Sequence, residues 1–166
     1  MRIAGGLIAV VLVLPGAASA RISDGAGLGF AWPADGIVSS PFGPRAGGFH
    51  PGIDIGSLQA LTVRAASAGR VAAAGFAMGY EGYGNVVVVD IGGGFTTIYA
   101  HLARPIAHIG ELVSRGETIG IAGCTGWCSG THVHFELRDH GRAIDPIGFF
   151  GPGLPLGYTP SLIQGG

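Results

Sequence analysis

Two histidines lie one residue apart in the stretch GTHVHFEL, where His132 and His134 precede Glu136. Side chains along a β-strand alternate between its two faces, so these three polar residues share one face if the stretch is a strand. The opposite face would carry the apolar side chains of Val133, Phe135 and Leu137. The histidine face must then line something polar, either solvent or a cleft, and the pair alone does not decide between the two.

A second cluster with metal-binding chemistry, His50 and Asp54, occurs in FHPGIDIG. A catalytic zinc usually has three ligands such as imidazole and carboxylate, plus an open position for water. His50, Asp54 and one histidine of the pair would make such a site. The other histidine, about 6–7 Å along the strand, could reach water or a substrate oxygen without binding the metal. His101 in IYAHLA is either a satisfied core residue or part of the same site.

The elements that must position these residues are short strands. The 33 glycines have no collagen-like period and are typical of turns between many strands. Segments 85–91 and 95–101 flank three glycines and predict an antiparallel hairpin. Further strands are expected in three other segments: 61–76, 111–123 and 131–139. Segment 36–56 is expected to be loop with at most one strand. With no amphipathic helix, the fold class is all-β, an antiparallel sheet forming a sandwich or barrel.

Length and composition narrow the class of protein. The 166 residues fit one domain, and the apolar start, which ends in Ala-Ser-Ala at 18–20, is typical of a cleaved signal peptide. An uncleaved anchor or a core helix is the alternative. A formal net charge of −1 gives no electrostatic footprint for nucleic acid or an anionic membrane. No later stretch is apolar for long enough to span a membrane, so the mature chain is expected to be exported.

Cys124 and Cys128 lie in GCTGWCSG, directly before the two-histidine strand. In an exported protein this pair favours a disulfide over metal binding or redox catalysis, because the spacing is not C-x-x-C. So small a ring would remove only about 2 kcal/mol of unfolded-state entropy, and its main effect is expected to be a stiffer loop. Trp127 in this loop is either a substrate platform or a cap on the loop.

The order H-x3-D, Y-x-H-L and H-x-H-F-E resembles the lysostaphin-like (LytM-type) zinc endopeptidases, which cut bacterial peptidoglycan peptides. The framework pieces FGPR (42–45), GYGNVVVVD (82–90) and VSRGETIGIAG (113–123) also occur in family order, so the resemblance covers residues 36–147. No single motif is specific to this family. The three motifs together, in this order and at these intervals, are strong evidence for the resemblance. The resemblance implies an antiparallel β domain with an active-site groove.

The resemblance also implies a role for each site residue. His50, Asp54 and His134 would bind one zinc ion per chain. His101 and His132 would be catalytic, orienting the nucleophilic water, taking its proton or stabilising the oxyanion. Spacing does not tell which of the two is the base. The cysteine-bracketed loop departs from family loops, which are often rich in Ser, Thr and Gly, and this leaves substrate preference open.

Four other residues have simpler interpretations. Glu136 either accepts a hydrogen bond from a ligating histidine or forms an ion pair. Arg45 could contact a substrate carboxylate, although a structural role is the main expectation. His108 and His140 are expected to be exposed to solvent.

The implied function is an exported zinc metalloendopeptidase that cleaves peptidoglycan peptides in the cell envelope or outside the cell. The alternative is a noncatalytic domain of the same fold that binds peptidoglycan or activates another hydrolase. Such relatives are expected to have lost ligands or catalytic histidines, and all five positions are present here. A carbohydrate-binding β-domain would leave the ordered motifs unexplained.

The expected organisation is a signal peptide at 1–20, an N-terminal segment at 21–35, the peptidase domain at 36–150 and a flexible tail at 151–166. Trp32 and Pro33 of the N-terminal segment are either a lid over the cleft or a packing contact. The expected partner is a peptidoglycan peptide, with no nucleic acid and no membrane span after signal cleavage. Spacing does not reveal the oligomeric state, for which a monomer is the default expectation.

Overall fold

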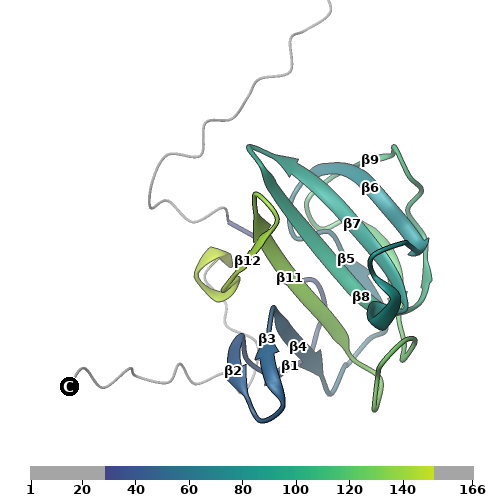
Figure 1. Cartoon of the computed structure of the whole chain (residues 1–166). Coiled ribbons are helices and arrows are strands. Elements are labelled where there is room, and N and C mark those ends of the chain that lie inside the picture. The colour runs from purple at the N-terminus through teal and green to yellow at the C-terminus, as the bar shows by residue number, and fades with distance from the viewer. Residues whose placement is uncertain (1–28, 152–166) are drawn as a thin grey trace, which may run out of the picture.

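The structure is a computed structural model that describes residues 29–151. The predicted signal peptide, residues 21–28 and the predicted tail from residue 152 lie outside the described residues. Residues 29–151 form twelve β-strands and two 3-10 turns, with no α-helix among them (Figure 1). The strands are β1 (Ile37–Ser40), β2 (Gly43–Arg45), β3 (Gly48–His50), β4 (Ile53–Gly56), β5 (Thr62–Arg64), β6 (Gly69–Phe76), β7 (Asn85–Gly92), β8 (Phe95–Pro105), β9 (Leu112–Val113), β10 (Thr118–Ala122), β11 (Val133–Asp139) and β12 (Arg142–Ile144). The 3-10 turns are η1 (Glu81–Tyr83) and η2 (Ile147–Phe149).

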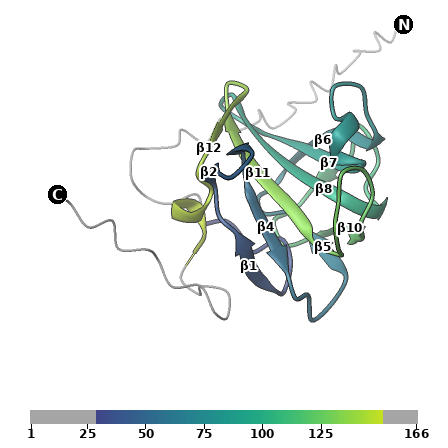
Figure 2. The ribbon, with the colours of Figure 1, turned by 60° about the horizontal axis from the view of Figure 1, so that its bottom comes forward.

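All strand pairs in this part of the chain are antiparallel, so the all-β prediction is confirmed. Ten strands form one sheet, whose main path is β1-β4-β11-β8-β7-β6-β9. Off this path, β12 pairs with β11, and β10 pairs with both β5 and β8. The β2–β3 hairpin is a separate unit near the β4 and β11 end of the sheet (Figures 1 and 2). The predicted hairpin is confirmed as β7 and β8.

The four valines at 86–89 are all buried because both faces of the sheet are covered at β7. Two of them pack in the main core with Tyr99, and the other two pack in a smaller cluster on the opposite face. Tyr80 and Tyr83, from the loop between β6 and β7, cover this smaller cluster. An uninterrupted apolar run is the pattern expected of a strand buried on both faces.

The prediction for segment 36–56 was wrong, because it contains four strands and not one at most. None is longer than four residues, and glycine or proline interrupts the sequence between them. Their partners include the distant strand β11, which pairs with β4. Short strands held by partners far away in sequence leave little local signal.

The end of the N-terminal segment packs against the end of the described chain. Phe30 is buried in the core, and its backbone forms a parallel bridge with Phe150. The Trp32 ring stacks on that of Phe150 with ring centroids 3.9 Å apart. Of the two roles considered for Trp32, the structure supports the packing contact.

Gly52 lies where the chain crosses β11, and a Cβ there would be 2.2 Å from the carbonyl oxygen of Phe135. We expect Gly52→Ala to lower the free energy of unfolding by about 1–3 kcal/mol because backbone must move. It should also weaken metal binding by shifting His50 and Asp54. Thermal denaturation followed by circular dichroism measures the first effect. Gly148→Ala is the control, since its Cβ would meet nothing within 4 Å. Equal melting temperatures for the two variants would contradict the predicted loss of stability.

Candidate metal centre

The pairing of β4 with β11 places Asp54 opposite His134. Their strand neighbours Ile53 and Phe135 are buried in the core, so both polar side chains point to the other face. His134 Nδ1 lies 2.8 Å from Asp54 Oδ1, and His50 Nε2, arriving from β3, lies 3.1 Å from each of these atoms. The three residues that the resemblance implies as ligands are thus brought together, and such a group could hold a metal ion.

The second ring nitrogen of each of these two histidines has its own hydrogen-bond acceptor. His50 Nδ1–H donates to the Pro41 carbonyl over 2.7 Å, and His134 Nε2–H donates to Glu136 Oε1 over 2.9 Å. With protons on those atoms, the facing nitrogens of neutral His50 and His134 present lone pairs to each other and to Asp54. Lone pairs so close together repel unless a cation lies among them. The donor set therefore fits a divalent cation of the zinc type.

The charges around the centre favour a cation. Burial raises the pKa of Asp54, but the imidazoles of His134 and His50, which donate to the carboxylate when they are protonated, together outweigh it and hold the pKa well below its usual value. Burial lowers the pKa of His134, but Asp54 and Glu136 on either side outweigh that and raise it. Two ionised carboxylates flanking one buried imidazole attract positive charge, either a proton or a metal ion.

Glu136 is fully buried and accepts three hydrogen bonds, from His134, from the Tyr83 hydroxyl at 2.5 Å and from Arg138 Nε at 2.7 Å. Burial raises the pKa of Glu136, but these donors outweigh it, so the carboxylate stays ionised. Both interpretations of Glu136, as acceptor for His134 and as ion-pair partner, therefore hold at once. Sequence reasoning missed Tyr83, because it lies 53 residues from Glu136 and no spacing links the two.

His101 reaches the groove through a β-bulge in β8. Asn85 of β7 lies opposite Leu102 but Val87 lies opposite Tyr99, so β8 contains one extra residue. His101 has a φ of 59°, in the left-handed region that few non-glycine residues adopt. Strict alternation would place His101 on the core face beside Tyr99, whereas the bulge turns it toward the groove and returns Leu102 to the core.

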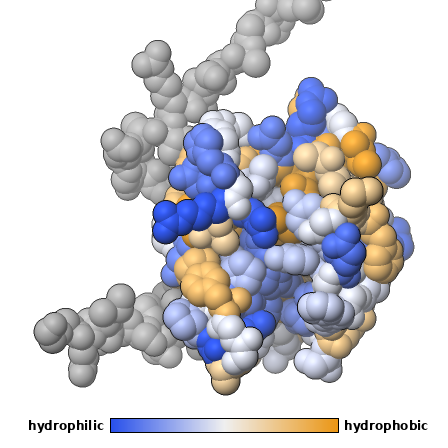
Figure 3. Space-filling view, in the orientation of Figure 1, coloured by the Kyte–Doolittle hydropathy of each residue, from blue (hydrophilic) through white to orange (hydrophobic). Residues whose placement is uncertain are grey.

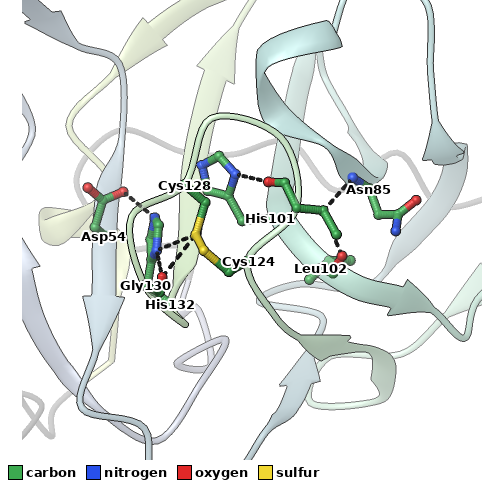
Figure 4. Close-up of a disulfide and its surroundings, with 9 residues drawn as sticks. Asp54, Asn85, His101, Leu102, Cys124, Cys128, Gly130 and His132 are labelled. Atoms are coloured by element: carbon green, nitrogen blue, oxygen red, sulfur yellow. Dashed lines mark hydrogen bonds and ion pairs between the residues drawn. A yellow bond between two sulfur atoms is a disulfide. The ribbon is translucent and has the colours of Figure 1, made fainter.

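His101 and His132 lie beside each other with ring centroids 4.7 Å apart (Figure 4). His101 Nδ1–H donates to the Thr125 carbonyl over 2.8 Å, and His132 Nδ1–H donates to the Gly130 carbonyl over 2.7 Å. Burial lowers the pKa of His101, and the Thr125 carbonyl offsets this only in part. The Nε2 atom of a neutral imidazole held in this way carries a lone pair and can accept a proton. Nε2 of His132 is 3.7 Å from Asp54 Oδ1.

These side chains line a groove with a volume of about 530 Å³. Arg45 and Phe49 of the β2–β3 hairpin border it on one side, and Tyr83 and Trp127 border it on the other. The hollow beside the β2–β3 hairpin is mostly hydrophilic and is flanked by hydrophobic side chains (Figure 3). The groove therefore offers both polar and apolar contacts to a ligand.

The remaining sequence predictions can be placed. Arg45 Nη1 donates to Ser40 Oγ over 3.3 Å and lies 3.7 Å from Asp54 Oδ2. Trp127 is 89% exposed on the rim of the groove, a position compatible with both of its roles. His108 and His140 are exposed, as predicted. The predicted disulfide joins Cys124 and Cys128.

The sequence profile of peptidase family M23 matches residues 48–146, which include all five candidate residues. The chain belongs to peptidase family M23. The predicted resemblance to this family is confirmed.

Two M23 relatives differ in what their names describe. The chain is 37% identical over 133 residues to the DD-carboxypeptidase/endopeptidase Mpg of Neisseria meningitidis, covering 76% of this chain and 29% of Mpg. It is 34% identical over 116 residues to the murein hydrolase activator NlpD of Escherichia coli, covering 70% of this chain and 30% of NlpD. The chain thus spans less than a third of the length of these curated relatives.

The fold also matches solved structures. The catalytic domain of the antimicrobial peptidase lysostaphin from Staphylococcus simulans is 30% identical, with a TM-score of 0.57. The match covers 69% of this chain and 89% of that domain. The antiparallel architecture is therefore that of M23 peptidases.

Replacing the buried carboxylate should weaken metal binding. Glu136→Gln removes the negative charge that His134 and Arg138 face, and such partners of metal ligands typically contribute 10–100-fold to affinity. We expect the zinc dissociation constant, measured by competition with a chromophoric chelator, to rise by about 10–100-fold. Glu111→Gln is the matched control, because the Glu111 carboxylate is away from the groove and accepts a hydrogen bond from the exposed backbone N–H of His108. An unchanged dissociation constant for Glu136→Gln would rule out this role.

Proposed function

We propose that the chain is an exported zinc metalloendopeptidase that hydrolyses peptide bonds in bacterial cell-wall peptidoglycan. The observation that carries this proposal is the convergence of His50, Asp54 and His134 in one groove with two further histidines, each of which is held through Nδ1 by a backbone carbonyl. A noncatalytic fold needs no such pairing of a cation site with two proton acceptors.

The metal proposed for this site is one zinc ion, held by His50 Nε2, His134 Nδ1 and the Asp54 carboxylate. When bound, zinc supplies a Lewis acid that acidifies water and polarises a carbonyl group. Membership of a peptidase family supports this choice, as does the donor set of two imidazoles and one carboxylate.

The chain's own residues then handle the proton and the substrate. Nε2 of either His132 or His101 accepts the proton of the attacking water, and the resulting imidazolium can pass it to the leaving amine. The second imidazole, whose ring lies beside the first, stabilises negative charge on the scissile carbonyl oxygen when it is protonated, because only then does its Nε2 carry a hydrogen to donate. Glu136 holds His134 in orientation throughout, through Nε2–H.

Peptidoglycan peptides are proposed as the substrate because of the relatives. Mpg is a DD-carboxypeptidase/endopeptidase, and lysostaphin is an antimicrobial peptidase. Arg45 and Glu81 place opposite charges along the groove, which suits a peptide that carries both carboxylate and amino groups.

The alternative function is a noncatalytic domain that activates another cell-wall hydrolase, favoured by the similarity to the murein hydrolase activator NlpD. The five polar side chains at the groove weigh against it, since an activator has no need of the two proton-accepting histidines. The two functions predict different results with purified peptidoglycan, because only a peptidase would release soluble peptides from it.

Export is proposed on the N-terminal sequence alone, because residues 1–20 have the pattern of a signal peptide. Among residues 29–151, no helix is long and apolar enough to cross a membrane.

The deciding experiment uses residues 21–166, the chain without the predicted signal peptide. Zinc content is measured by mass spectrometry, and release of soluble peptides from purified peptidoglycan is followed with and without chelator. One zinc per chain with chelator-sensitive release is the expected result. Zinc without release, combined with stimulation of a purified cell-wall hydrolase, would favour the activator. Absence of zinc would contradict the site.

Single alanine substitutions should separate metal binding from turnover. His134→Ala removes a ligand and is expected to abolish stoichiometric zinc binding. His132→Ala should keep one zinc but lower kcat by about 10²–10⁴-fold, the usual contribution of a proton-transferring group. His108→Ala is the control, since His108 is exposed and does not line the groove. Normal turnover by His132→Ala would show that the roles of His132 and His134 are wrongly assigned.

A further inference from the structure

The carbonyl groups that hold the two non-ligand histidines belong to one short loop. His101 donates to the carbonyl of Thr125, and His132 donates to the carbonyl of Gly130. Thr125 lies inside the ring closed by the Cys124–Cys128 disulfide, and Gly130 lies two residues beyond it. Figure 4 shows the Cys124–Cys128 disulfide beside His132 and Gly130, with His101 nearby. We propose that this disulfide-closed loop positions both histidines, setting each in the tautomer with the proton on Nδ1.

The Thr125 hydroxyl anchors the loop to the two strands beside it, β7 and β8. Thr125 Oγ1 donates to the Leu102 carbonyl over 2.8 Å and accepts from the Asn85 backbone N–H over 2.9 Å. Leu102 follows His101 at the bulge, so the Thr125 hydroxyl fixes the loop to the backbone that carries one of the histidines. A Cβ at Gly84 would lie 2.4 Å from Thr125, so the two segments are in close contact.

The other end of the loop is tied to the second histidine. The backbone N–H of His132 donates to the Gly123 carbonyl over 3.2 Å, so the residues on either side of the loop are bonded to each other. Cys128 Sγ lies 3.0 Å from the Gly130 oxygen and 3.7 Å from His132 Nδ1. The sulfur therefore packs against both partners of the His132 hydrogen bond.

The disulfide adds a covalent constraint to these hydrogen bonds. The loop sequence, CTGWCSG, contains two glycines, and the residues Gly126 and Trp127 are exposed. A short covalent ring removes conformational freedom that would otherwise let the two carbonyls move. A neutral imidazole without a fixed acceptor exchanges between its tautomers, and with the proton on Nε2 it cannot accept one there.

The candidate metal ligands do not depend on this loop. His50 is oriented by the Pro41 carbonyl and His134 by Glu136, on other elements. Loss of the disulfide should thus lower turnover and leave zinc binding intact. The role in turnover rests on the proposed function, whereas the tautomers can be observed without any substrate.

The test is the double variant Cys124→Ser/Cys128→Ser of the zinc-loaded chain, labelled with ¹⁵N. Long-range ¹H–¹⁵N spectra of the histidine rings report the tautomer of each residue. In the wild type we expect Nδ1–H forms for His101 and His132. In the double variant we expect mixed tautomers for these two alone, one zinc per chain and kcat lower by about 10-fold with KM little changed, a part of the 10²–10⁴-fold that proton transfer contributes.

A second variant keeps the proposal testable if the double variant does not fold. Thr125→Val retains the disulfide and removes the hydroxyl that anchors the loop, so the tautomer of His101 should become mixed. Thr125→Ser, which restores a hydroxyl, should restore the wild-type spectrum. Trp127→Ala is the matched loop control and should leave both tautomers unchanged, because its side chain holds neither imidazole.

Two outcomes would overturn the proposal. Unchanged tautomers in the double variant would show that the loop does not position the histidines. Loss of zinc and of the ordered His50 and His134 signals would show that the disulfide holds the whole domain together instead. If the wild type hydrolyses no substrate, the proposed function fails, but the ring spectra still decide whether the loop positions the pair.

Discussion

The register of β4 against β11 is the constraint on which the rest of the metal centre depends. Asp54 lies opposite His134 because Ile55 pairs with Val133 and Ile53 with Phe135, and all four apolar side chains are buried. A slip of one residue would move the polar pair into the core and expose its apolar neighbours. The burial of those neighbours therefore fixes the distance between the two candidate ligands. The same strand register therefore packs the core and brings the two candidate ligands together.

Buried polar groups are tolerated around this register because they form a connected network. Among residues 29–151, no buried side-chain nitrogen or oxygen lacks a hydrogen-bond partner. Glu136 is central, since it links His134 on the same strand to Tyr83 in η1. Burial and the negative charge of Glu136 raise the pKa of Tyr83, so its hydroxyl remains a donor at any physiological pH. The loop that carries Tyr83 is thereby fixed at the edge of the groove as well.

The site divides its tasks between two kinds of structure. Regular strand pairing and the β2–β3 hairpin place the candidate ligands, whose geometry must be the most exact. A bulge and a loop place His101 and His132, whose role is to exchange protons. The left-handed φ of His101 costs about 1–3 kcal/mol, and the hydrogen bonds of Thr125 to both neighbouring strands hold the chain in that conformation. Strain thus occurs at the residue that strict alternation would have placed in the core.

The sequence by itself determined the all-β class, the β7–β8 hairpin and the split of β11 into a core face and a polar face. These follow from local composition and period-two alternation, which a single segment carries. The candidate site residues were predicted from the order of three motifs that resembles a known family. Only the tertiary structure decided how β1 to β4 pair, why His101 faces the groove and that Tyr83 supports Glu136. Each of these depends on contacts between segments distant in the chain, such as the bulge created where β8 meets β7. Local sequence cannot specify them, because the partner that supplies the energy lies elsewhere in the chain.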